Sequence, residues 1–196
     1  MKLSQIKKRL ARGFTLVELM VVVAILGVLI AVVAPSMVGT KDPSNAQLIS
    51  RASEVVAHNL SAISQTCGTS TAIASNPLPA GSNTIYDVIF GGSSKVAAAY
   101  TTCYAQSKVL PLTEISQPSG TAGQYNIAGF GVTFTGGGTS PLSVVFANVP
   151  DNLVLLVAQK YNPSLATLAA SDTASPVVQY STATSGTRTL TIIKQI

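Results

Sequence analysis

The sequence predicts an α+β protein in which a long N-terminal helix packs on a C-terminal antiparallel β-sheet. Three observations support this fold class. An apolar run occupies residues 14–34, and apolar residues at helical spacing follow on one side of residues 44–66. From residue 125 onward, β-rich segments alternate with glycine-containing turns. A helix laid across a sheet buries the apolar face of each element, so these segments are expected to form one domain.

The N-terminus joins a basic segment to the apolar run. The first 13 residues carry five basic residues and no acidic one: Lys2, Lys7, Lys8, Arg9 and Arg12. Such a cluster stays on the cytoplasmic side of a membrane, so we expect the remainder on the outer side. The 21 residues from Phe14 to Ala34 would extend about 31 Å as a helix, which is the thickness of a bilayer's hydrocarbon core. A cleaved secretory signal fits poorly, because the apolar region of a typical signal peptide is shorter than this run and is followed by a small-residue cleavage site.

One carboxylate, Glu18, lies near the start of the apolar run. Only Thr15, Glu18 and Gly27 interrupt its apolar character. A carboxylate inside lipid costs on the order of 2.5–3.5 kcal/mol even on lenient scales, so a functional role is expected. The alternative is an ordinary membrane anchor in which Glu18 has no role.

The segment RGFTLVE, from Arg12 to Glu18, with the apolar run and Pro35 after it, resembles the type IV pilin family, which includes the pseudopilins of type II secretion. The resemblance covers about the first quarter of the chain. It implies that a membrane-embedded prepilin peptidase cleaves after Gly13 and that the new amino terminus, Phe14, is N-methylated. It also implies that Glu18 meets the charged amino terminus of a neighbouring subunit during assembly. A buried charge is tolerable when it is paired in this way.

The resemblance also implies partners and a location. The subunit would sit in the inner membrane as a single-pass prepilin with a cytoplasmic N-terminus and then join an extracellular filament, a helical homo-oligomer. Assembly would need an inner-membrane platform, a cytoplasmic ATPase and, in a Gram-negative cell, an outer-membrane secretin. The alternatives are a pseudopilin or minor pilin of a type II secretion or DNA-uptake machine, and a membrane-anchored adhesin that never polymerises. The filament's biological task stays open.

Charge and composition argue against other classes of function. The chain has 12 Lys and Arg against 7 Asp and Glu, a net charge of +5. Five of these basic residues lie in the leader, so its removal leaves 7 against 7 and a net charge of zero. Bulk charge therefore does not indicate a nucleic-acid partner. No nucleophile with an adjacent base, paired carboxylates or metal-ligand set is evident, so we expect no enzymatic activity, cofactor or metal. The lone histidine, His58, is expected to be structural.

The chain divides into five expected regions. These are a leader (1–13), a transmembrane and assembly helix (14–35) kinked near Gly27 and Pro35, an amphipathic continuation (36–66), a variable loop region (67–118) and a sheet region (119–196). Cys67 and Cys103 both lie on the outward side of the apolar run. An oxidising compartment favours a bridge between them, which would stabilise the fold by roughly 3–4 kcal/mol. Two free buried thiols are the alternative.

Local patterns predict the elements after the membrane segment. The helix over residues 44–66 should expose Arg51, Glu54 and His58, with Lys41 just before it. Residues 84–90 fit a short helix or a strand, and residues 95–106 are weakly helical. Strands are expected over 125–135 and 142–148, with a turn at the triglycine 136–138, and a helix over 152–161. Two final strands, 177–180 and 187–193, should flank a Thr-Ser-Gly turn.

Overall fold

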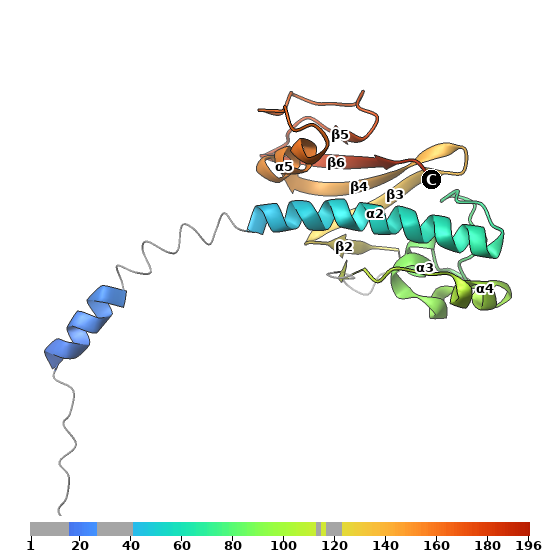
Figure 1. Ribbon diagram of the computed structural model, residues 1–196, viewed down its shortest axis with the longest axis horizontal. Helices are drawn as coiled ribbons and strands as arrows, with labels where there is room; N and C mark the ends of the chain where they lie inside the picture. The colour runs from blue at the N-terminus through green and yellow to red at the C-terminus, as the bar shows by residue number, and fades with distance from the viewer. Residues whose placement is uncertain (1–15, 27–40, 113–114, 117–122) are drawn as a thin grey trace, which may run out of the picture. The chain divides into compact units, whose positions relative to one another are not determined.

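The computed structural model describes residues 16–26, 41–112, 115–116 and 123–196 (Figure 1). The chain separates into two compact units, Met1–Lys41 and Asp42–Ile196. In the first unit, residues 16–26 form a helix. The leader, the predicted cleavage position at Gly13 and Phe14, and the predicted kink at Gly27 and Pro35 lie outside the described residues.

The second unit is built from helix α2 (Lys41–Cys67) laid across one face of an antiparallel sheet (Figure 1). The sheet has six strands in the order β1-β2-β3-β4-β6-β5. Each neighbouring pair is antiparallel. The strands are β1 (Ile115–Ser116), β2 (Tyr125–Ile127), β3 (Phe130–Gly137), β4 (Ser140–Pro150), β5 (Val178–Tyr180) and β6 (Thr187–Lys194). This arrangement confirms the predicted α+β fold.

Helix α2 buries the apolar stripe that its sequence predicts. Ile49, Val56, Leu60 and Ile63 are fully buried in the core that the helix shares with the sheet. The helix already includes Lys41, so the predicted start at residue 44 is too late, and Asp42 lies inside the first turn. It ends at Cys67, after which the left-handed backbone of Gly68 (φ 64°) stops it.

The connection between α2 and the sheet contains several short helical segments. The undecided run 84–90 is a helix, α3 (Ile85–Gly91). Its start is fixed by Asp87, whose carboxylate accepts hydrogen bonds from the backbone nitrogen and the hydroxyl of Thr84, both at 2.8 Å. The weakly helical run 95–106 forms pieces: η1 (Ser93–Lys95), η2 (Ala98–Tyr100) and α4 (Thr101–Gln106).

The sheet differs from the prediction at one turn. The expected single strand over 125–135 is two strands, β2 and β3, joined at Ala128 and Gly129. Both turn residues have positive φ, 53° and 85°, as a tight hairpin of this type requires. Alanine is unusual in that conformation, so the sequence carries little signal for the turn. In the triglycine, Gly136 and Gly137 belong to β3, and the turn starts at Gly138.

One face of the sheet is covered and the other is open. Helix α5 (Asp151–Tyr161) buries Leu153, Val154 and Val157. Along β3 the buried Val132 and Phe134 alternate with exposed Thr133 and Thr135. The final strands, β5 and β6, occupy almost their predicted positions. Because alternate residues of a strand point to opposite faces, Thr133 and Thr135 mark the face away from the core.

Candidate functional site

Apart from Glu18, the helix of residues 16–26 is apolar on every side, and its side chains are exposed. Its nine large apolar side chains are 48–73% exposed: Leu16, Val17, Leu19, Met20, Val21, Val22, Val23, Ile25 and Leu26. A helix with no polar face needs an apolar environment supplied by lipid or by other chains. In the described part of the chain, no helix is long and apolar enough to cross a membrane.

Glu18 lies within the first described turn of this exposed helix. The side chain is exposed, with apolar neighbours in sequence on both sides. The structure therefore presents a carboxylate on an otherwise apolar surface, as the sequence predicts. Phe14, its predicted partner on a neighbouring subunit, lies outside the described residues.

The two cysteines are joined. Cys67, the last residue of α2, forms a disulfide with Cys103 of α4, and their Cα atoms are 5.1 Å apart. Neither cysteine is free, which confirms the predicted bridge. The bond ties the end of the long helix to the helical connection and closes a separation of 36 residues.

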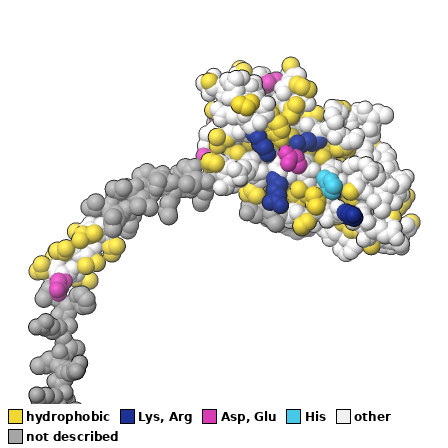
Figure 2. All heavy atoms as spheres, in the orientation of Figure 1, with side chains coloured by type: hydrophobic (Ala, Val, Ile, Leu, Met, Phe, Trp, Pro, Cys, Tyr) yellow, Lys and Arg dark blue, Asp and Glu magenta, His cyan; other side chains and the backbone are white. Residues whose placement is uncertain are grey.

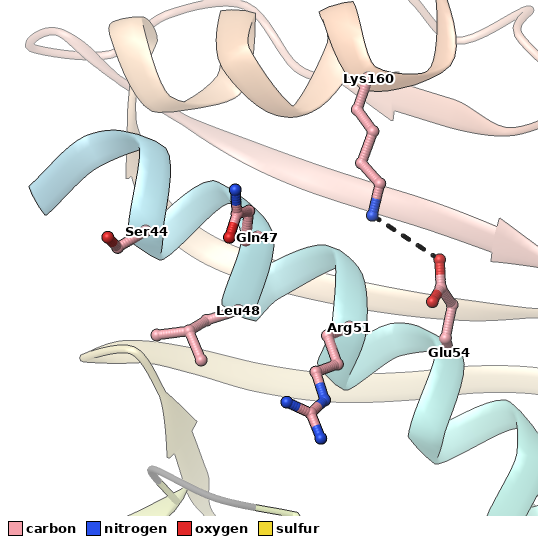
Figure 3. Close-up of a pocket in the computed structure, with 6 residues that line it drawn as sticks. All are labelled: Ser44, Gln47, Leu48, Arg51, Glu54 and Lys160. Carbon is pink, nitrogen blue, oxygen red and sulfur yellow. Dashed lines mark ion pairs between the residues drawn. The ribbon is translucent and has the colours of Figure 1, made fainter.

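The exposed side of α2 carries a cluster of charges. Glu54 Oε1 lies 3.8 Å from Lys160 Nζ of α5 and 3.8 Å from Lys194 Nζ of β6. Arg51 lies one turn earlier, and Figure 3 shows its guanidinium directed away from Glu54 while Lys160 reaches toward it. Among the described residues no carboxylate pairs with Arg51. Figure 2 shows Lys and Arg side chains gathered about a carboxylate on this face.

Two shallow hollows flank this cluster. The first, about 630 Å³, is lined by Ser44, Gln47, Leu48, Arg51, Glu54 and Lys160 (Figure 3). The second, about 320 Å³, is lined by Arg51, Glu54, Val55, His58, Leu110 and Pro111. We call the two hollows together the α2 groove. His58 is exposed, as expected for a solvated structural residue.

The far wall of the groove is held by a buried amide. Asn59 is fully buried on α2. Its side-chain nitrogen donates to the backbone oxygen of Leu110 at 2.9 Å, and the backbone nitrogen of Leu110 donates to its side-chain oxygen at 2.8 Å. The Asn59 side chain is therefore the hydrogen-bond partner of both the backbone nitrogen and the backbone oxygen of Leu110. In the sequence Asn59 is a polar residue within the apolar stripe of residues 44–66, and the pattern alone gives no sign of this role.

Two further buried charged residues are structural. Asp87 accepts hydrogen bonds from Tyr125, Gly123 and Thr84. Burial raises the pKa of its carboxyl, but these hydrogen bonds outweigh burial and lower it to about 2. Arg188 of β6 donates to Asp151 and to three backbone oxygens. The three-residue spacing from Thr84 to Asp87 matches a capping box, which is the signal that finds Asp87 in the sequence.

The described residues contain no arrangement for metal chemistry. No group of three or more His, Cys, Asp or Glu side chains among them could hold a metal ion. Asp87 lies in the interior, whereas Glu54 and His58 are exposed.

The N-terminal part of the chain is similar to known proteins. Residues 8–34 match the family described as the prokaryotic N-terminal methylation motif. Over 51 residues the chain is 41% identical to type II secretion system core protein G of Klebsiella michiganensis. The N-terminal segment of the chain is therefore type IV pilin-like. The aligned part makes up 26% of this chain and 34% of the relative, so the pilin-like chain spans about a third of the curated relative it matches. No solved structure matches it.

The matched motif contains four of the predicted site residues of the pilin-like chain: Gly13, Phe14, Glu18 and Gly27. Pro35 follows it directly. Of these residues the structure describes Glu18 alone. Pilin and pseudopilin families are structural proteins. The residues predicted for processing and assembly thus fall in or directly after the matched segment, and the α2 groove is a separate feature of the second unit.

Proposed function

We propose that this chain is a structural subunit of a type IV pilus. It is cleaved by a prepilin peptidase after Gly13, N-methylated at Phe14, and polymerised through its N-terminal helix into an extracellular filament. One observation carries the proposal: the methylation motif at residues 8–34 coincides with a helix whose apolar side chains are all exposed. Such a helix can move from lipid to the apolar centre of a fibre without exposing its side chains to water.

The architecture of the second unit supports the role of a filament subunit. It is a compact domain with its own core and a disulfide, and it follows the apolar helix in the sequence. A carboxylate at Glu18 adds specificity, because a charge placed in an apolar interface is stable only when an opposite charge meets it. The amino group of Phe14 on a neighbouring copy supplies that charge after cleavage.

A second function is favoured by one comparison. The 41% identity to a type II secretion core protein over 51 residues supports a pseudopilin that forms a short periplasmic fibre. A pilus subunit would be abundant outside the cell, whereas a pseudopilin would remain in the periplasm at low abundance.

The two functions are separated by isolating filaments. Filaments are sheared from intact cells and the subunit's N-terminal peptide is sequenced by mass spectrometry. A main subunit that begins with N-methyl-Phe14 supports the pilus subunit. A mature chain recovered only from the periplasmic and membrane fractions supports the pseudopilin. A chain that keeps residues 1–13 in every fraction contradicts both.

A further inference from the structure

The described residues place more positive than negative charge around the α2 groove. Two ammonium groups, Lys160 and Lys194, share one oxygen of Glu54, and Arg51 has no carboxylate partner among the described residues. The Lys160 and Glu54 side chains are 46% and 54% exposed, so water screens their pair and it contributes little to stability. Arg51 and Lys160 line the groove and Lys194 lies beside it, so among the described residues three cations surround one anion, a local surplus of two positive charges.

The other described carboxylates of the second unit form no ion pair with Arg51, Lys160 or Lys194. Asp42 accepts from Asn152, Asp151 pairs with Arg188, and Asp172 accepts from two backbone nitrogens. Asp87 is buried. Among the described residues Glu54 is therefore the one carboxylate that pairs with these cations, and the remaining positive charge attracts anions from solution. Because the mature sequence is neutral in sum, only the folded structure reveals this separation of charge.

We propose that the α2 groove docks on the anionic phosphate headgroups of a bilayer surface before the subunit is assembled. The proposal rests on the proposed function, because the membrane that holds the apolar helix then lies within reach of the tethered domain. Tethering raises the effective concentration of the headgroups, so even a weak surface can engage them. A nucleic-acid backbone is disfavoured, since single-stranded binding uses exposed aromatic platforms and the groove lining contains none.

The expected strength follows from the net charge. Each surplus cation near an anionic membrane strengthens binding by roughly fivefold at physiological salt. Two surplus charges therefore favour the docked state on an anionic bilayer over a neutral one by roughly 25-fold. The interaction should weaken with salt, because exposed charges are screened over a Debye length of about 8 Å at physiological ionic strength.

The test uses the full mature chain in lipid nanodiscs with neutral or one-third anionic phospholipid. A dye is attached at Gln47→Cys, which lines the groove, or at Thr133→Cys, which lies on the open face of the sheet. Quenching by spin-labelled headgroups reports contact with the bilayer. We expect quenching at residue 47 in anionic nanodiscs, little in neutral ones, loss in high salt, and little at residue 133 in either.

Charge variants separate docking from folding. Arg51→Gln combined with Lys160→Gln should lower the docking equilibrium by roughly 25-fold, while Lys95→Gln, which removes one positive charge from η1, should change it less than about twofold. Glu54→Gln should strengthen docking by roughly fivefold, although it removes two ion pairs. A purely structural cluster would not gain contact with lipid from that change.

Several outcomes overturn the proposal. Equal quenching at residue 47 in neutral and anionic nanodiscs would show that charge does not hold the groove at the membrane. Release by millimolar inorganic phosphate would assign the site to a free anion, and tighter binding of duplex DNA than of anionic lipid would assign it to nucleic acid. Because the nanodiscs hold unassembled subunits, each of these results leaves the filament experiment unaffected.

Discussion

The hydroxyl of Tyr125 donates a 2.7 Å hydrogen bond to the carboxylate of Asp87 inside the second unit. Asp87 lies in the first turn of α3 and Tyr125 begins β2, so this bond joins the helical connection to the sheet. The carboxylate also accepts from the backbone nitrogens of Thr84 and Gly123. Buried charge is stable here because hydrogen-bond donors surround it.

Acid should destabilise the domain through Asp87. Its pKa is lowered from 3.8 to about 2 in the folded protein. The unfolded state therefore takes up a proton first as the pH falls. Asp87 contributes stability that is fully present above pH 3.8 and is lost as the pH falls toward 2. We expect the free energy of unfolding to drop by about 2 kcal/mol across this window, as measured by urea unfolding at successive pH values.

Asp87→Asn is the variant that tests this dependence. It should lower stability at pH 6 by about 2–3 kcal/mol, because the amide cannot accept all the hydrogen bonds that the carboxylate accepts. It should also flatten the loss of stability between pH 4 and pH 2. Asp172→Asn, at a carboxylate in a surface loop, serves as the control and should keep the acid sensitivity. An unchanged acid profile in Asp87→Asn would rule out this assignment.

The disulfide should supply a large share of the domain's stability. Replacing Cys67 and Cys103 together by serine releases a closed loop of 36 residues, and we expect a loss of about 3–4 kcal/mol on the chain-entropy account. Denaturant unfolding with and without a reductant provides the measurement. The reductant should destabilise the wild-type protein and leave the double variant unchanged. A thiol assay on the denatured protein that detects two free thiols would contradict the bridge.

Gly137 should be intolerant of a side chain. Its φ is 78°, and an added Cβ would lie 2.2 Å from the backbone oxygen of Thr71. Gly137→Ala therefore meets both backbone strain and a clash with main-chain atoms. Gly129→Ala is the matched control, because its φ is 85° but no described atom lies within 4 Å of the added Cβ. We expect a loss of about 1–2 kcal/mol in the control and a distinctly larger loss, with a lower thermal midpoint, in Gly137→Ala.

Patterns of apolar residues predicted most of the fold, because burial on one side of an element leaves a local record. The stripe of α2 and the alternation of Arg188, Leu190 and Ile192 on β6 are such records. Features that depend on contacts between distant parts of the chain left no such local record in the sequence. Ala128 adopts a positive φ against its preference, and residues 84–90 become a helix that Tyr125, far along the chain, helps to fix.

The same division applies to the candidate site. The motif around Glu18 is contiguous, so its residues could be named from the sequence. The α2 groove could not be predicted, because Glu54 on α2 meets Lys160 of α5 and Lys194 of β6 only after the chain has folded. Counting charges along the chain gave a neutral mature protein and concealed their separation.

Asn59 should hold the wall of the α2 groove. Asn59→Ala leaves both backbone groups of Leu110 without their partner, and we expect a loss of about 2–4 kcal/mol. Limited proteolysis should then cut more rapidly near residue 110. Gln65→Ala removes an exposed hydrogen bond to Ser61 on the same helix and should change stability by less than about 0.5 kcal/mol. Equal losses of stability in the two variants would contradict the proposed role of Asn59.

Glu18→Ala should separate processing from assembly. Cleavage after Gly13 should continue, because the change lies outside the cleaved bond, and the mature subunit should accumulate in the membrane fraction. Filament yield should fall at least tenfold, because the charged amino group of Phe14 then enters an apolar interface without a carboxylate. Glu18→Asp keeps the charge on a shorter side chain and should retain part of the yield. Electron microscopy of sheared material measures the yield, and N-terminal mass spectrometry confirms cleavage. Filaments in normal number from Glu18→Ala would show that assembly does not depend on this pairing.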